Sequence, residues 1–357
     1  MAMQAKRCVR RFLLAIVYAC TCLCLFSGGS SALATPEAVA SFYSGKTIRM
    51  LISGPPGSGY DIYARLLSRH MGKHIPGNPT FVPENMTAAG GLVLLNTAYN
   101  TGPFDGTLMF TLHFNLPLYQ AIGGVGVRFD IARMSGIGRL LASNAATGLY
   151  SQSASGVTNV SEAKFRKTVI GSAGATSNST LFPLVMNRIL GTQIKVVSGY
   201  DGETAIFLAM ERGEVDGFGA YSYLTFKSVH PEYLTQKLVL PLVQWGAVRE
   251  REWRDVPTAV EAAESPRDKQ AMGLISAGSD IGFSYFVGPG VPQERIDALR
   301  EAFQLVLKDR EFLAEVEQAK LSLRPMSGED IQSLVRSVLT APKDVVERVI
   351  DVTKLEN

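Results

Sequence analysis

The stretch GKTIRMLISGPPGSGYDIYARLL, residues 45–67, predicts a strand, a glycine-rich turn and a helix in succession. The apolar run at residues 48–52 is typical of a buried strand. Apolar side chains then recur at helical spacing, at Ile62, Tyr63, Leu66, Leu67 and Met71. Strand, turn and helix in this order build α/β proteins, and the turn between them is a common ligand site.

Two nucleotide-binding motifs are excluded by the order of the residues. In a P-loop the Gly-Lys-Thr ends the glycine loop, whereas here Gly45-Lys46-Thr47 precedes the strand, and Ala40 stands where the motif needs its first glycine. The turn itself reads GPPGSG at residues 54–59, with two prolines where a dinucleotide motif faces the phosphates. The turn is therefore not expected to hold a nucleotide.

A turn of this kind can receive an anion without lysine or arginine. The first N–H groups of a helix are unpaired and carry a partial positive charge, which favours a bound carboxylate. The alternative is a tight turn with no ligand.

A second stretch has the same order of strand, turn and helix, because Val169 and Ile170 lead into GSAGATSNST at residues 171–180 and then into a helical segment. Its alternative is an ordinary helix start capped by Ser179 or Thr180. Two such turns together predict a ligand between two domains.

Residues 1–34 are predicted to be a cleavable secretory signal peptide, with cleavage near Ala34 and a periplasmic mature protein. An apolar run at residues 12–26 is followed by the small-x-small site Ala32-Leu33-Ala34. The run is shorter than the ~20 residues of a membrane span. Lipidation at Cys20 is the alternative. The basic residues that precede the apolar run are Lys6, Arg7, Arg10 and Arg11.

Removal of this segment changes the composition of the chain. It carries all four cysteines, so the mature chain can form neither a disulfide nor a thiolate metal site. It also carries four of the 35 basic residues and no acidic ones, which leaves 31 basic against 32 acidic residues, a net charge of −1. No basic stripe with interleaved aromatic residues appears, which excludes nucleic acid as a partner. About 320 mature residues predict two domains.

Strand-like and helical segments alternate along the chain, which predicts parallel α/β sheets. The first series of strands covers residues 48–52, 80–83 and 108–112, and the second covers 168–171, 194–197 and 214–219. A helix is expected at residues 203–212. The C-terminal part reads as helical, with Pro292 opening one helix and residues 331–338 forming the last well-patterned one.

The chain lacks the motifs of the common hydrolases. It contains no G-x-S-x-G elbow and no H-E-x-x-H helix. His70 and His74 have the spacing of metal ligands, but no carboxylate beside them in the sequence completes a set, so they are expected at an exposed helix end. No enzyme activity, cofactor or metal is predicted, and an exported hydrolase of unrecognised type is the alternative.

Nine short motifs, in this order, resemble the exported receptors of tripartite tricarboxylate transporters, often called Bug proteins. They are GKTIR at 45–49, PPG at 55–57, EN at 84–85, AGG at 89–91, DGTL at 105–108, GSAG at 171–174, GEVD at 213–216, DVPT at 255–258 and GPGVP at 288–292. The resemblance covers nearly the whole mature chain. It implies a two-lobed α/β periplasmic binding protein of type II, the Venus-flytrap form. Lobe 1 would comprise residues 35–140 and 256–357, and lobe 2 residues 141–255.

The resemblance also implies a function and a set of site residues. Such a receptor captures a small organic (di)carboxylate, is not an enzyme, acts as a monomer, and delivers its ligand to the membrane subunits of a tripartite tricarboxylate-type transporter. Main-chain groups, small hydroxyls and bound waters hold the carboxylates. The matching residues are Pro56, Gly57, Ser58, Gly59 and Asp61 in the first turn, and Ser172, Gly174, Ala175, Thr176 and Ser177 in the second. Asp61 would either meet a donor on the ligand or serve as an acid in the first turn of its helix.

Three departures from the family pattern leave the identity of the acid open. Thr176 stands where glycine is usual, Ser179-Thr180 where histidines are frequent, and Ala220 where an acidic residue often follows the Val-Asp strand. Four aromatic residues after strand-like runs would either line the cleft or pack in the core. They are Tyr60, His113, Tyr221 and Tyr223.

Overall fold

The computed structural model describes residues 36–142, 145–174, 177–200 and 202–354. The predicted signal peptide lies outside the described residues, as do Ala175 and Thr176 of the second turn. Residues 39–357 form one compact unit. Within the described ranges, the chain has no helix with the length and apolar character that crossing a membrane requires.

A six-stranded sheet contains the three strands of the first predicted series. Its order is β11-β4-β10-β3-β1-β2. The strands β1 (Thr47–Ile52), β2 (Thr80–Asn85) and β3 (Leu108–Leu112) run parallel, as expected, with β1 between the other two. The chain adds β4 (Ser135–Leu141), β10 (Phe283–Val287) and β11 (Met326–Ser327). Strand β10 runs antiparallel to both β3 and β4, so the complete sheet is mixed, although the three expected strands are parallel.

A five-stranded sheet contains the second series, in the order β7-β6-β8-β5-β9. The strands β6 (Thr168–Ser172), β7 (Ile194–Ser198) and β8 (Gly217–Ser222) are parallel. Strand β5 (Ala145–Tyr150) pairs antiparallel with β8 and with β9 (Val239–Trp245). Glycine and alanine are poor strand formers, and they weaken the sequence signal of β4 and β5. In β4, a Cβ on Gly138 would lie 2.3 Å from the ring of Phe303, so this glycine lets a helix approach the sheet closely.

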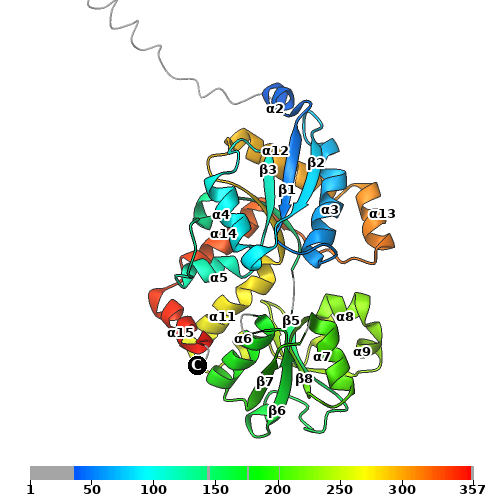
Figure 1. Ribbon diagram of the computed structural model, residues 1–357, viewed down its shortest axis with the longest axis vertical. Helices are drawn as coiled ribbons and strands as arrows, with labels where there is room; N and C mark the ends of the chain where they lie inside the picture. Colours follow the sequence, from blue (N-terminus) through cyan, green and yellow to red (C-terminus); the bar gives the residue numbers. More distant parts are fainter. Residues whose placement is uncertain (1–35, 143–144, 175–176, 201, 355–357) are drawn as a thin grey trace, which may run out of the picture. The chain divides into compact units, whose positions relative to one another are not determined.

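Helices cover both sheets (Figure 1). The helices α3 (Gly59–Met71) and α12 (Gln293–Val306) pack on the first sheet, and α6 (Asn178–Val185) and α7 (Gly202–Glu211) on the second. Helix α13 (Arg310–Gln318) packs on α3, and α15 (Lys343–Thr353) on α6 and α11 (Pro266–Ile281). The remaining α-helices are α2 (Pro36–Tyr43), α4 (Leu92–Asn100), α5 (Leu116–Ala121), α8 (Tyr223–Val229), α9 (Pro231–Thr235), α10 (Ala259–Ala262) and α14 (Gly328–Leu339).

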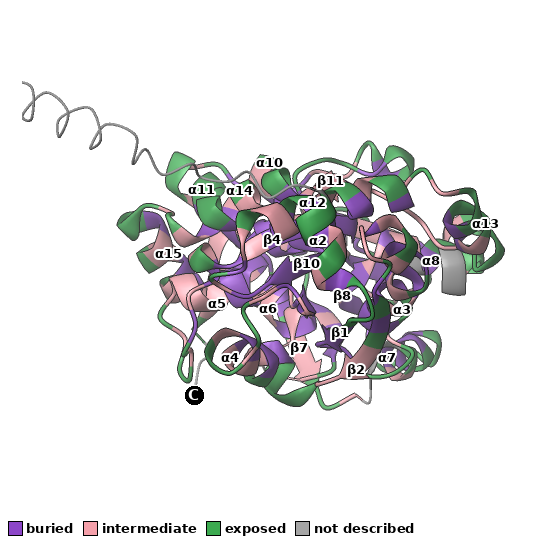
Figure 2. Cartoon of the chain, turned by 90° about the horizontal axis from the view of Figure 1, so that it is seen from above, coloured by how far each residue is buried: buried purple, intermediate pink, exposed green. Residues whose placement is uncertain are grey.

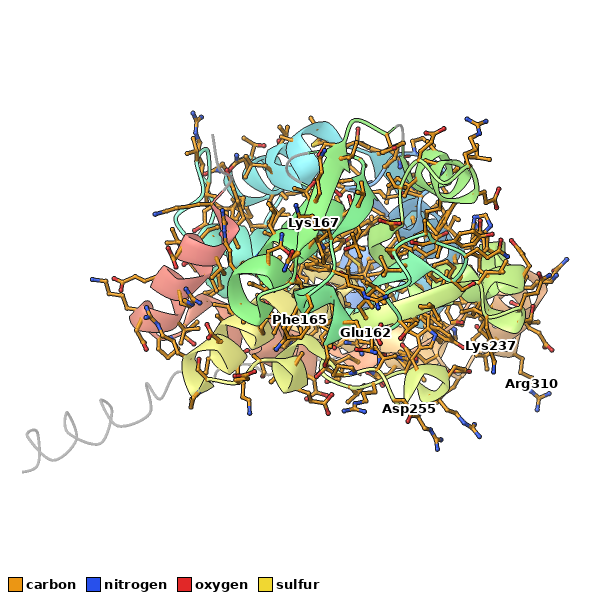
Figure 3. All side chains as sticks on the ribbon, turned by 90° about the horizontal axis from the view of Figure 1, so that it is seen from below. Glu162, Phe165, Lys167, Lys237, Asp255 and Arg310 are labelled. Atoms are coloured by element: carbon orange, nitrogen blue, oxygen red, sulfur yellow. The ribbon has the colours of Figure 1, made fainter. Side chains whose placement is uncertain are left out.

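Most residues of the strands are buried, whereas the helices expose one face (Figure 2). The labelled side chains of Lys237, Asp255 and Arg310 are exposed and extend outward in Figure 3. In the second sheet the fully buried Trp245 stacks on Phe182 of α6, with ring centroids 3.9 Å apart. Its indole N–H donates to Thr147 Oγ1 at 2.9 Å. Helix α6, which begins at the second turn, is thereby held against the sheet.

Candidate functional site

The first predicted turn links β1 to α3 and is shaped by its own side chains. Gly57 has φ +80°, a left-handed conformation that favours glycine. Ser58 caps α3, since its Oγ accepts a hydrogen bond from the Asp61 N–H at 3.4 Å. A Cβ on Gly59 would lie 2.5 Å from the ring of Phe283, so glycine is needed there for close packing.

The carboxylate of Asp61 folds back onto the turn. Its Oδ2 accepts from the Gly57 N–H at 2.9 Å, and its Oδ1 accepts from Arg65 Nε at 2.7 Å and from Asn85 Nδ2 at 2.8 Å. Burial raises the pKa of Asp61, but the hydrogen bonds from Gly57, Asn85 and Arg65 outweigh this and lower it. Both oxygens are thus engaged within the protein, and the ionised carboxylate fixes the shape of the turn.

The first two N–H groups of α3 are not used by the described part of the fold. Within the described part of the chain, the backbone N–H groups of Gly59 and Tyr60 have no hydrogen-bond acceptor. Unpaired N–H groups at the start of a helix attract an anion. The negative charge of Asp61 is offset by the bonded guanidinium of Arg65. This start of α3 is therefore suited to a carboxylate.

The second predicted turn links β6 to α6, and its cap differs from the expected one. Ser177 caps α6, because its Oγ accepts from the Ser179 N–H at 3.2 Å. Ser179 and Thr180, which the sequence suggested as caps, instead bond to Ser172: its Oγ lies 2.8 Å from Ser179 Oγ and 2.5 Å from Thr180 Oγ1. Short polar side chains compete for the same backbone groups, so a run of five of them, at residues 176–180, does not reveal its cap in the sequence.

This hydroxyl network determines which parts of the second turn are accessible. Ser172 is fully buried, and its hydroxyl is bonded inside the turn. Thr180 Oγ1 also donates to the Gly174 carbonyl at 2.7 Å. Among the described residues, its two chain neighbours aside, Gly174 has no atom within 4 Å of the position that a Cβ would take, and its φ is not left-handed. The main chain at Gly174 therefore borders open space, whereas the buried hydroxyl of Ser172 lies on the inner side of the turn.

A third segment, which the sequence analysis did not assign to the site, lies at the ends of β2 and β3. The η3 turn (Ala88–Gly91) follows β2 and has three consecutive left-handed residues, Ala89, Gly90 and Gly91. A Cβ on Gly91 would lie 3.0 Å from His113 Cβ and 3.2 Å from Ser53 Cβ. The carboxyl ends of β1, β2 and β3 thus converge, which is where open α/β sheets bind ligands. The run Ala89-Gly90-Gly91 after a strand was the available signal.

A cavity of about 560 Å³ adjoins these strand ends. Residues of η3, α5, α6 and α15 line it, together with Leu92 at the start of α4, Ile122 after α5, and His113 and Asn115, which follow β3. The ring of His113 stacks on that of Tyr60, with centroids 5.4 Å apart. Burial lowers the pKa of His113 to about 4, so the ring is neutral at physiological pH. Its buried Nδ1 has no hydrogen-bond partner among the described residues.

The other predicted aromatic residues pack in the core. Tyr60, Tyr221 and Tyr223 are all buried. The hydroxyl of Tyr60 accepts from the Phe114 N–H at 2.9 Å, which holds the end of β3 against the start of α3. Of the four aromatic candidates, His113 is the one found lining a described cavity. The described residues of the two predicted turns line none of the three described cavities.

His70 and His74 are not at an exposed helix end, which corrects the expectation from the sequence. Helix α13 brings carboxylates to both: His70 Nε2 lies 2.7 Å from Glu315 Oε2, and His74 Nε2 lies 2.7 Å from Asp309 Oδ2. Ligand atoms of His70, Asp309 and Glu311 lie within 4.8 Å of one another, a spacing that suits a metal ion. The ammonium of Lys73 lies 2.7 Å from Asp309 Oδ2 and occupies the same carboxylate. The cluster thus acts as an ion-pair link between α3 and α13.

No protein-family model and no curated protein sequence matches the chain. Solved structures do match it.

One is a TctC solute-binding protein from Polaromonas, with 17% identity, 86% of this chain and 99% of that chain covered, and a TM-score of 0.65. Two others are the R. palustris protein Rpa4515 with adipate and MatC from Rhodopseudomonas palustris with bound malate. Each is 18% identical to this chain. The match to Rpa4515 covers 86% of this chain and 97% of that chain, with a TM-score of 0.59. The match to MatC covers 84% of this chain and 99% of that chain, with a TM-score of 0.58. The chain therefore has the two-lobed α/β fold of periplasmic solute-binding proteins of the TctC and Bug type.

Proposed function

We propose that this protein is a non-catalytic receptor that binds a small organic (di)carboxylate and delivers it to the membrane subunits of a tripartite tricarboxylate-type transporter. The observation that carries the proposal is the start of α3, where the N–H groups of Gly59 and Tyr60 have no acceptor among the described residues. A carboxylate would accept from both. The lobes would comprise residues 35–140 with 256–357, and residues 141–255.

The second turn supports the same proposal. Ser177 and the accessible main chain of Gly174 lie at the start of α6, which offers the same partial positive charge as α3. Each helix start would take one end of a dicarboxylate. Two of the proteins that share the fold were solved with adipate and with malate, both of which are dicarboxylates.

The proposal includes export, because a transporter of this kind needs a receptor outside the cytoplasmic membrane. The signal-like segment at residues 1–34 supports this location, and the receptor would be a monomer in the periplasm. N-terminal sequencing of exported protein should give a start near Thr35. A lipid-modified start at Cys20 would instead place the receptor on the membrane.

The function is tested by a thermal-shift screen of mono- and dicarboxylic acids against the mature protein. A ligand at 100 times its dissociation constant should stabilise the fold by ~2.7 kcal/mol. The matched control is the neutral amide of each acid, such as succinamide for succinate, which should give no shift because the helix starts select negative charge. If no acid raises the melting temperature, or if amides act equally well, the receptor proposal is wrong.

A further inference from the structure

We propose that the cavity lined by η3, α5, α6 and α15 receives an uncharged, largely apolar arm of the ligand, so that the preferred ligands are organic acids with such an arm. This inference rests on the proposed function, since it requires that a carboxylate is held at the helix starts. It adds a second recognition element, which distinguishes organic acids by the group attached to the carboxylate.

The position of the cavity supports this assignment, because one residue of its lining contacts each helix start. On one side His113 lines it and stacks on Tyr60, whose N–H is one of the two free donors of α3. On the other side Asn115 lines it, and Asn115 Nδ2 donates to Asn178 Oδ1 at 3.2 Å. Asn178 is the residue next to the cap Ser177. The cavity is thus linked to each helix start through one residue of its lining.

The lining determines which chemical group fits. None of the lining residues that the structure describes carries a charge. A second carboxylate placed there would lose its hydration without gaining a cation, which costs several kcal/mol. An alkyl or aromatic group would instead contact aliphatic side chains. These are Leu92, Leu116, Leu118, Leu181 and Val349 from the helices and Ile122 at the end of α5.

The size of the cavity and the unpartnered polar atom of His113 narrow the choice further. Its volume of about 560 Å³ has room for a phenyl-sized arm. His113 contributes the buried Nδ1 that has no partner among the described residues. Buried polar atoms normally have a hydrogen-bond partner, and an occupant with one polar atom near His113 would supply it. The neutral ring offers no charge to a second anion.

The experiment measures dissociation constants by calorimetry for acids that differ in one arm. The pairs are succinate with benzylsuccinate and propionate with 3-phenylpropionate. The wild-type protein should bind the armed acid at least about tenfold more tightly than its parent in one or both pairs, since burial of a phenyl group contributes well over the 1.4 kcal/mol that tenfold requires. The ratio of the two constants is the readout.

Leu118→Trp fills the cavity and should bring that ratio close to one, and Ile122→Trp does so independently should the first variant fold poorly. The matched control is Leu313→Trp on α13, an exposed leucine outside the cavity, which should keep the wild-type ratio. If the parent acids bind but the arm adds nothing, or if both filled variants keep the ratio, the cavity assignment is overturned while the receptor proposal stands. If no acid of either kind binds, both the receptor proposal and the cavity assignment are wrong.

Discussion

Gly57 and Gly174 occupy corresponding places in the two turns, yet they differ in how they tolerate a side chain. Both have free space around the position of a Cβ, but Gly57 alone has a left-handed φ. Gly174→Leu should therefore leave the free energy of unfolding within about 1 kcal/mol of wild type and weaken acid binding at least tenfold, because the side chain takes the space of a carboxylate. Chemical denaturation and calorimetry measure the two effects.

The comparison variant is Gly57→Leu, which should also weaken binding but should cost a further ~1–2 kcal/mol of stability from backbone strain. Full binding by a folded Gly174→Leu protein would remove the second turn from the site. Equal stability of the two variants would show that strain at residue 57 is unimportant.

His113 should make the fold sensitive to mild acid. In the unfolded chain it takes up a proton near pH 6.5, whereas burial lowers its pKa in the folded protein to about 4. The unfolded state therefore binds more protons between these values. The stability contributed by the neutral ring is complete above pH 6.5, is lost as the pH falls, and is gone below pH 4. The loss amounts to about 3 kcal/mol at most.

The matching variant is His113→Phe, which keeps an aromatic ring but cannot be protonated. Urea denaturation at pH 7 and at pH 4.5 should show a smaller loss of stability for His113→Phe than for wild type, by about 2 kcal/mol. Parallel pH profiles for the two proteins would mean that His113 is hydrated in the folded state.

At the scale of elements, α13 is held to α3 through one carboxylate. Asp309 caps α13 by accepting from the N–H groups of Glu311 and Phe312, and it also accepts from Lys73 and His74. The ammonium of Lys73 is the main cause that holds the pKa of Asp309 well below its usual range. Asp309→Ala should lower the free energy of unfolding by about 1–3 kcal/mol, since a helix cap and a partly buried ion pair are lost together.

Glu311→Gln is the control within the same cluster, because its carboxylate is 76% exposed and should contribute less than about 0.5 kcal/mol. Both values follow from urea denaturation. An Asp309→Ala protein as stable as Glu311→Gln would show that the link between α3 and α13 is not important for the fold.

Elements were predictable where one local pattern determines them. Apolar runs predicted β1, β3 and β6 closely, and helical spacing predicted α3 and α12. Strands β4 and β5 carry little apolar signal, because their glycines and alanines serve close packing instead. The partners of His70 and His74 stand more than 230 residues later in the chain, at a distance that no local spacing reports.

At the scale of the whole molecule, we expect ligand binding to close the two lobes, because each helix start would supply half of the contacts to the acid. Small-angle scattering with and without a saturating acid should show a smaller radius of gyration for the bound form. Scattering with the neutral amide of the same acid is the control and should match the free protein. Identical curves at proven saturation would contradict a closing cleft.

The two turns could be predicted from the sequence because each is a continuous segment of about ten residues. The cavity could not, since its lining comes from η3, α4, α5, α6, α15 and the segment after β3, and these are brought together only by the fold. The lobe boundaries and the contacts of the ten predicted site residues with a ligand stay predictions. The shapes of the two turns are nevertheless explained by their own side chains, such as Asp61 and Ser172, which form hydrogen bonds inside the turns.

The stacking of Trp245 on Phe182 provides an optical reporter. The chain has only two tryptophans, Trp245 and Trp253, and neither lies in the first sheet. Trp245 rests against the helix that begins at the second turn, so a small displacement of α6 on ligand capture changes the surroundings of the indole. Its ultraviolet emission should shift in wavelength or intensity as α6 moves, without any attached dye. Stopped-flow mixing could then time the arrival of an acid at the second turn separately from events at the first.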